Sequence, residues 1–285
     1  MSMRGGVLLA RLRDRLRGRE QLVRRGASQL RWKAAVLRHA RRGVGLQTIA
    51  GAPAPRETVV IVCLWGRPHR LPAILESLAE QKDCPPLRLV VWNNDHRNDA
   101  HYREEIARNG ARGALSRVDF GTSRINLGGM ARFLVARTVT TVGAPQPFLM
   151  IDDDQDLDER FVAETLRAAG PRVYAGVWAF RLGEGYWDRL EIEPGENATY
   201  VGTGGSVCDS ALVHERGFFR GCPAKYGFVE DLWASSFAAE RKWSMSKTSA
   251  ELTFVDDDVN QYPRMVWLKA EFFEYLRDHH GYGSR

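Results

Sequence analysis

The most constraining feature of this chain is a short apolar run that ends in three carboxylates. Phe148–Ile151 is apolar, Asp152, Asp153 and Asp154 follow at once, and a helical pattern begins near Phe161. Such a run is typical of a buried parallel strand, and open α/β sheets bind ligands beyond their carboxyl strand ends. Adjacent carboxylates repel one another unless positive charge lies between them, and Mg²⁺ or Mn²⁺ shared with a phosphate supplies it. The segment therefore predicts a metal–phosphate site; an acidic turn that caps the next helix is the alternative.

The preceding sequence alternates between strand and helix patterns. Thr58–Leu64 and Leu87–Trp92 read as buried strands, and an amphipathic helix is expected between them at His69–Gln81. A second helix is expected at Met130–Val139, after the glycines of the Asn126–Gly129 segment. This order predicts an α/β fold with a Rossmann-like mixed sheet flanked by helices. The chain contains no GxGxxG dinucleotide fingerprint and no phosphate-binding P-loop sequence.

Charge divides the chain unevenly. Residues 1–56 hold 14 basic and two acidic residues, whereas the remainder holds 27 basic and 33 acidic residues. We expect a basic helical extension with a linker at 1–56, a domain that carries the acidic triplet at 57–260 and a C-terminal helix at 261–285. The helix would pack on the domain or extend from it.

A leucine-rich column repeats every seven residues from Leu9 to Leu37, without the companion column of a coiled coil. Residues 1–50 could therefore lie on an anionic membrane, pack on the domain, bind a partner or nucleic acid, or remain a poorly ordered arm.

The sequence also indicates a compartment. It contains no apolar run of transmembrane length and no signal-peptide core. Its four cysteines lack the spacing of a zinc site, so we expect reduced thiols. These features favour a cytoplasmic protein. Peripheral attachment to the inner face of the membrane is a further possibility for such a protein.

Several landmarks together resemble the GT-A glycosyltransferases of the family-2 type, especially rhamnosyl- and galactofuranosyl-transferase-like members. The landmarks are TVVIVCLWGRP from Thr58, LRLVVWNND from Leu87, NLGG from Asn126, FLMIDDDQDLDERF from Phe148, GTGGS from Gly202 and GFVEDLW from Gly227. The resemblance covers about residues 57–245. It implies a GT-A fold and a nucleotide-sugar donor.

The resemblance also implies roles for individual residues. Asp152 and Asp154 would hold Mg²⁺ or Mn²⁺, and Asp231 would be the general base, with Glu230 beside it. The implied donor-binding residues are Leu64, Arg67, Asn93, Asp95, Asn126, Gly128, Gly129, Arg132 and Asp153. The implied acceptor-side residues are Gly204, Gly205 and Trp233. The second strand ends in Asn-Asn-Asp where the family usually has Asp-Asn-Gly-Ser, so the residue that would read the base stays open.

The function expected from these residues is metal-dependent inverting transfer of a sugar to an acceptor hydroxyl. A carboxylate must take the hydroxyl proton, and a metal stabilises the departing diphosphate. A UDP-sugar is the favoured donor, with dTDP- and GDP-sugars as alternatives, and the acceptor would be a glycan, a lipid-linked group or a protein. The competing readings are a nucleotidyltransferase and a non-catalytic binding protein that works through its basic extension.

Overall fold

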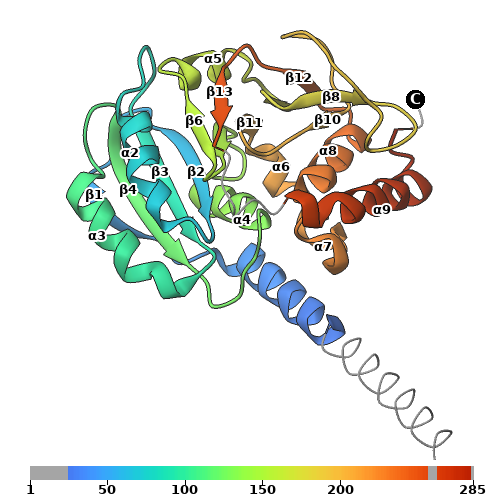
Figure 1. The fold of residues 1–285 in the computed structure, drawn as a ribbon, viewed down its shortest axis with the longest axis horizontal. Helices are drawn as coiled ribbons and strands as arrows, with labels where there is room; N and C mark the ends of the chain where they lie inside the picture. The colour runs from blue at the N-terminus through green and yellow to red at the C-terminus, as the bar shows by residue number, and fades with distance from the viewer. Residues whose placement is uncertain (1–24, 256–261, 284–285) are drawn as a thin grey trace, which may run out of the picture.

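A central eight-stranded sheet organises the molecule. The structure is a computed structural model that describes residues 25–255 and 262–283 (Figure 1). In sheet order the strands are β1 (Gln47–Gly51), β4 (Leu115–Thr122), β3 (Leu87–Asn93), β2 (Thr58–Leu64), β5 (Pro147–Ile151), β11 (Ser206–Asp209), β7 (Val173–Gly176) and β12 (Ser244–Lys247). Strands β4, β3, β2 and β5 run parallel, whereas β1 and β11 run antiparallel to their neighbours. The predicted mixed sheet is confirmed.

Helices and two small sheets complete the fold. After the N-terminal helical segment, the α-helices are α2 (Leu71–Ala79), α3 (Asp99–Asn109), α4 (Met130–Val139), α5 (Phe161–Arg167), α6 (Ala211–His214), α7 (Phe218–Gly221), α8 (Glu230–Glu240) and α9 (Tyr262–His280). The 3₁₀ turns are η1 (Pro68–Arg70), η2 (His96–Asn98) and η3 (Ala224–Tyr226). The small sheets pair β10 (Tyr200–Val201) with β8 (Ala179–Leu182) and β9 (Arg189–Leu190), and β13 (Leu252–Phe254) with β6 (Gln155–Leu157).

Two hydrophobic cores cover the two faces of the sheet, because side chains alternate along a strand. Val60, Val62 and Leu64 of β2 face one core, to which α2, α3 and α5 contribute. Val59 and Ile61 face the other core, formed with α4, α6, α7, α8 and α9. In Figure 1, α2 and α3 accordingly lie on one side of the molecule, and α8 and α9 on the other. The sheet is therefore buried on both faces, as the apolar strand sequences predict.

The described part of the basic extension belongs to the domain. Residues 25–42 are helical, and the buried Trp32 donates from its indole nitrogen to the Leu127 carbonyl oxygen at 3.2 Å. The Lys33 ammonium donates to the Phe219 carbonyl oxygen at 3.1 Å. Leu30, a member of the predicted apolar column, is 73% exposed. The helix at 25–42 thus contacts the domain through the face that carries Trp32. The part of the leucine-rich column before residue 25 lies outside the described residues.

The boundary expected between residues 56 and 57 is wrong. Strand β1 precedes it and forms a ladder with β4 in which Gln47 pairs with Phe120. The linker expected at the end of residues 1–56 therefore comes after an edge strand of the sheet, which ends at Gly51. The sequence did not predict β1 because it is a short edge strand with no buried residue.

The apolar run from Arg172 to Phe180 does not form one strand. It divides into β7 and β8, because the chain leaves the central sheet after Gly176. The Val177 amide donates to the Gly205 carbonyl oxygen, and the Trp178 carbonyl oxygen accepts from the Gly202 amide. The break leaves the Trp178 ring beside the carboxyl edge of the sheet.

No described helix has the length and apolarity needed to cross a membrane. Cys63, Cys84, Cys208 and Cys222 are free cysteines in the structure.

Candidate active site

Two pockets open beyond the carboxyl ends of the parallel strands. The arginine pocket, of about 250 Å³, is lined by Cys63, Trp65, Arg67, Asn94, Asn126, Gly128, Gly129, Arg132, Asp152, Asp153, Asp154, Thr203, Phe228, Glu230, Asp231, Met265 and Lys269. The aromatic pocket, of about 300 Å³, is lined by Asp152, Asp154, Gln155, Trp178, Tyr200, Gly202, Thr203, Gly204, Asp231, Phe254 and Lys269. Asp152, Asp154, Thr203, Asp231 and Lys269 line both, so the two pockets meet at these side chains.

The acidic triplet after β5 is anchored to the turn after β2. The two carboxylate oxygens of Asp153 accept from the Trp65 amide at 3.1 Å and from the Arg67 guanidinium at 2.8 Å. The same guanidinium nitrogen lies 3.7 Å from Asp154 Oδ2. Because β2 and β5 are parallel neighbours, their ends bring these groups together. Asp153 is therefore held in place, while Asp154 faces both pockets.

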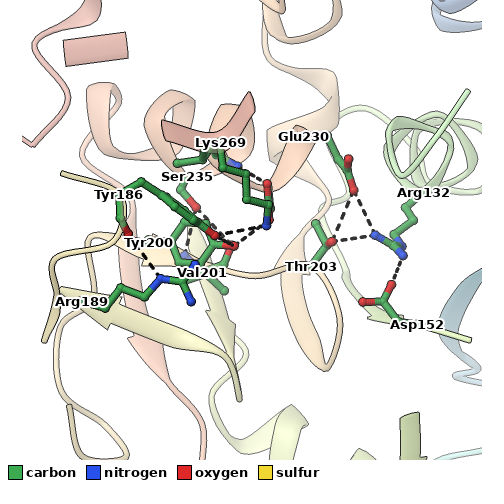
Figure 2. A network of polar contacts seen from close by, with 12 residues as sticks. Arg132, Asp152, Tyr186, Arg189, Tyr200, Val201, Thr203, Glu230, Ser235 and Lys269 are labelled. Carbon is green, nitrogen blue, oxygen red and sulfur yellow. Dashed lines mark hydrogen bonds and ion pairs between the residues drawn. The ribbon is translucent and has the colours of Figure 1, made fainter. Parts of the chain in front are cut away.

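A second buried network lies around Arg132 on α4 (Figure 2). Its guanidinium donates to Asp152, to Thr203 Oγ1 at 2.6 Å and to Glu230 Oε1 at 3.1 Å. Asp152 comes from the end of β5 and Glu230 from the first turn of α8. Arg132 thereby joins three segments that are distant in the sequence.

Burial changes the acidity of two pocket carboxylates. Burial, and next the charges of Asp152 and Asp153, raise the pKa of Asp154 to about 6. Burial is also the main cause that raises the pKa of Glu230 to about 7, against the opposing charge of Arg132. Both groups therefore exchange protons near neutral pH.

The pKa of Asp231 shifts in the opposite direction. Its Oδ2 accepts from the Tyr200 hydroxyl at 2.6 Å and from the Lys269 ammonium at 2.7 Å, and its Oδ1 accepts from the Leu232 amide at 2.8 Å. Burial acts to raise the pKa of Asp231, but the charge and hydrogen bond of Lys269 and the hydrogen bond of Tyr200 outweigh it. The pKa falls below its ordinary value of 3.8, so this carboxylate is ionised at neutral pH.

The lining charges of the arginine pocket suit a divalent cation together with an anion. Five carboxylates face three cationic side chains there, an excess of two negative charges when all are ionised. Among the described residues, no three His, Cys, Asp or Glu side chains converge into a complete metal cluster. A cation held by Asp152 and Asp154 would therefore take further oxygen ligands from a phosphate or water, as Mg²⁺ commonly does.

Two buried donors, one from each pocket, indicate a ligand with acceptor oxygens. Gln155 Nε2 and Arg132 Nε are buried and have no hydrogen-bond partner within the described chain. Gln155 is held beside the acids because its Oε1 accepts from the Asp152 amide at 2.9 Å. A buried donor without a partner is costly, so acceptor oxygens of a ligand would satisfy these two groups.

Glycines keep the pockets open. A Cβ atom on Gly129 would lie 1.6 Å from Glu230 Oε1, and one on Gly204 would lie 2.1 Å from Asp152 Oδ2. Larger residues at these positions would displace the carboxylates.

The structure brings most of the predicted residues together, but not all. Arg67, Asn126, Gly128, Gly129, Arg132, Asp152, Asp153, Asp154, Gly204, Glu230 and Asp231 line one or both pockets. Leu64 does not, because it faces the core of α2 and α3; its neighbours Cys63 and Trp65 line the pocket instead. Asn93 is also buried, where its amide donates to Asp99 at 2.7 Å.

Three more predicted residues lie outside both pockets. Asp95 binds Arg97 in the turn after β3, and Asn94 takes the pocket position. Gly205 packs closely against Leu252, whose Cδ2 would lie 2.5 Å from a Cβ atom at this position. Trp233 is in the core, where its indole nitrogen donates to the Phe218 carbonyl oxygen at 2.8 Å. The prediction that Trp233 lies on the acceptor side is therefore corrected: Trp233 is a core residue.

Sequence reasoning missed several lining residues. Lys269, Trp178, Tyr200, Phe254, Thr203 and Gln155 carry no motif of their own. Thr203 lies in the GTGGS segment and Gln155 directly follows the acidic triplet. Their position next to motif residues could therefore have identified them. Nothing in the local pattern distinguished Lys269 from other helix lysines.

Comparison with known proteins identifies a solved structure of similar fold. No protein-family model matches the sequence, and no curated protein matches it. Among solved structures, the mannosyltransferase PcManGT from Pyrobaculum calidifontis is similar, with a TM-score of 0.56, 15% identity, and coverage of 88% of this chain and 72% of that one. This similarity confirms the predicted GT-A fold.

Two further structures are more distant. TarS from S. aureus has a TM-score of 0.46 and 16% identity over 78% of this chain, which spans 43% of the length of TarS. GalNAc-T7 has a TM-score of 0.47 and 12% identity over 78% of this chain, which spans 48% of its length.

Proposed function

We propose that this protein is a metal-dependent, inverting glycosyltransferase that moves a sugar from a nucleotide-diphosphate donor to an acceptor hydroxyl. The observation that carries the proposal is the meeting of two pockets at one set of carboxylates. The arginine pocket would hold the donor and the aromatic pocket the acceptor, and Asp231 lines both. The solved structure of PcManGT, which shares the fold, is a complex with GDP-Man and Mn²⁺.

The donor would bind through its diphosphate. Asp152 and Asp154 would hold Mg²⁺ or Mn²⁺, which when bound supplies positive charge to the departing diphosphate. Arg132 would donate to oxygens of the donor, and the orphaned Gln155 amide, which lines the aromatic pocket, would donate to an acceptor oxygen beside it. Trp65, Asn94 and Asn126 would line the nucleoside end of the pocket. A UDP-sugar stays the favoured donor, with dTDP- and GDP-sugars as alternatives.

Asp231 is the proposed general base. A base must first reach the hydroxyl that it deprotonates, and only then does its pKa matter. Glu230 has the pKa closer to neutrality, but it lines the arginine pocket and is bound to Arg132 on the donor side. Asp231 also lines the aromatic pocket, and its Oδ1 keeps a lone pair for the acceptor proton. Attack from the aromatic pocket on a sugar whose diphosphate lies in the arginine pocket inverts the anomeric centre.

The acceptor would contact aromatic rings. Trp178 and Phe254 are 40% and 49% exposed, and their ring centroids lie 5.4 Å apart in an edge-to-face arrangement. Such rings suit the apolar face of a sugar, so a glycan or a glycan-bearing lipid or protein fits this pocket. Attachment of residues 1–50 to an anionic membrane at the inner face stays a prediction; it now concerns the exposed face of the N-terminal helix.

A donor screen tests the proposed function. The full-length protein with Mn²⁺ is incubated with UDP-, GDP- and dTDP-sugars, and release of the nucleoside diphosphate is followed. We expect slow hydrolysis of one donor class that accelerates with its acceptor, and a product of inverted anomeric configuration by proton NMR. Release of pyrophosphate from a nucleoside triphosphate instead would support a nucleotidyltransferase, and no turnover with any donor would favour a binding protein.

Gly204→Ala provides a steric test of the pocket junction. The added methyl group would displace the Asp152 carboxylate and the Gln155 amide, whose nearest atoms would lie 2.1 and 2.6 Å from it. A displacement of about 1 Å costs about 100-fold in activity, so we expect a loss of that order in kcat/KM. Gly185→Ala is the matched control, because nothing lies within 4 Å of its Cβ position. Equal rates for both variants would contradict the proposed role of the junction.

A further inference from the structure

The C-terminal helix α9 brings a cationic side chain to the junction of the two pockets. Lys269 lines both pockets, and its ammonium donates to Asp231 Oδ2 at 2.7 Å and to the Tyr186 hydroxyl at 3.2 Å. Its side chain is 12% exposed, as is that of Asp231. Figure 2 places Lys269 next to Tyr186 and Tyr200. This buried ion pair joins α9 to the first turn of α8.

The helix that carries Lys269 is firmly anchored. Phe272, Phe273 and Leu276 are fully buried, and the Phe272 ring stacks on Tyr226 with 4.2 Å between centroids. Because this face of α9 is fixed in the core, the Lys269 ammonium is positioned before any substrate arrives. Pre-organised charges of this kind need no rearrangement during a reaction.

The hydrogen bonds also divide the two oxygens of Asp231 between different tasks. Oδ2 accepts from Tyr200 and Lys269 and is fully used, whereas among the described residues Oδ1 accepts from the Leu232 amide alone. We propose that Lys269 is a positioning residue that, together with Tyr200, fixes Oδ2 and so presents Oδ1 to the acceptor hydroxyl. This inference rests on the function proposed above, and it makes α9 part of the active site.

No other group around Asp231 in residues 25–255 and 262–283 supplies the same charge. Glu230 precedes it on α8, and the tyrosines that face it are Tyr174, Tyr186, Tyr200 and Tyr282. Burial raises the pKa of each of these tyrosines, so they are neutral at ordinary pH. Arg189 lies over the Tyr186 ring, with 4.4 Å from its guanidinium carbon to the ring centroid. Among the described residues, Lys269 is thus the cationic side chain in direct contact with Asp231.

The charge of Lys269 can be tested without turnover. The Asp231 carboxyl is titrated by carbon-13 NMR in the wild type and in Lys269→Met, Lys269→Arg and Tyr200→Phe. An opposite charge at this range lowers a carboxyl pKa by about 1–3 units, so Lys269→Met should raise the Asp231 pKa by at least about one unit. Lys269→Arg should restore the wild-type value, and Tyr200→Phe should raise it less, because it removes a neutral donor. An Asp231 pKa that Lys269→Met leaves unchanged would overturn the inference.

Kinetics connects the charge to the reaction. In Lys269→Met the acid limb of the kcat pH profile should move upward by the same amount as the Asp231 pKa, and Lys269→Arg should reverse the change. If Lys269→Met lowers the melting temperature but leaves the acid limb of the kcat pH profile unchanged, Lys269 has only a structural role and the inference is overturned. If Lys269→Met does not fold, Lys269→Gln, which keeps a donor and removes the charge, replaces it. A wild type that titrates as expected but transfers no sugar would overturn the proposed function and leave the Lys269–Asp231 pair intact.

Discussion

Asp231→Asn should lower kcat by about 10²–10⁴-fold, the usual range for a positioned acid–base group. The amide has the shape of the carboxylate and keeps an oxygen for the Tyr200 and Lys269 donors, but it cannot take the acceptor proton. Donor affinity, measured by calorimetry, should change little because the base acts on the acceptor. The measurement is steady-state transfer with both substrates saturating.

Glu230→Gln is the matched control for this variant. Its carboxylate lies beside that of Asp231 in sequence, yet it contacts Arg132 and Thr203 on the donor side. We expect a smaller loss of kcat and a weaker donor. Near-normal kcat in Asp231→Asn with a collapse in Glu230→Gln would exchange the two roles.

The pH profile separates the two carboxylates further. A lowered pKa keeps Asp231 ionised until the pH falls below 3.8, so its protonation would not limit kcat near neutrality. The pKa of Glu230 is raised to about 7, so a base at Glu230 would give an acid limb near pH 7. A kcat that stays constant as the pH falls from 8 through 7, with metal and donor saturating, supports Asp231.

Asp154→Ala should remove the metal-dependent part of donor binding. Losing one partner of a buried charged contact costs about 2–5 kcal/mol, so affinity for the nucleoside diphosphate should fall roughly 30-fold or more in the presence of Mn²⁺. The fold should survive, because Asp154 lies in a turn and packs in neither core. Calorimetric titration with UDP and GDP is the measurement.

Asp156→Ala is the control within the same acidic run. Its side chain is 58% exposed, pairs with Arg70 and lines neither pocket. It should bind the nucleoside diphosphate like the wild type. Equal losses in the two variants would indicate general electrostatics and not a specific metal ligand.

The sequence predicted the strand pattern and the acidic motif because both depend on local order. β2, β3, β5 and α4 lie where the apolar runs and the glycine segment indicated. Leu64 failed as a donor residue because strand side chains alternate between faces, and this position points into the core of α2 and α3. The fold therefore follows from periodicity, whereas the pocket lining depends on which face each end residue takes.

The other failures have tertiary causes. Trp178 reaches the aromatic pocket because the chain leaves the sheet after Gly176, where hydrogen bonds to Gly202 and Gly205 replace the ladder. Lys269 reaches Asp231 from 38 residues further along the chain. No local pattern encodes either contact, so a sequence read one segment at a time could not have placed them.

The central claim is that the arginine pocket binds a nucleoside diphosphate together with a divalent cation. Its lining carries two excess negative charges when fully ionised, so without a cation it should repel a diphosphate. The direct measurement is calorimetric titration of the wild-type protein with UDP and GDP, in Mn²⁺ and after chelation. The account predicts binding of at least one nucleotide in Mn²⁺ that weakens at least about tenfold on chelation. Equal affinity in both conditions, or no binding of either nucleotide in Mn²⁺, would contradict it.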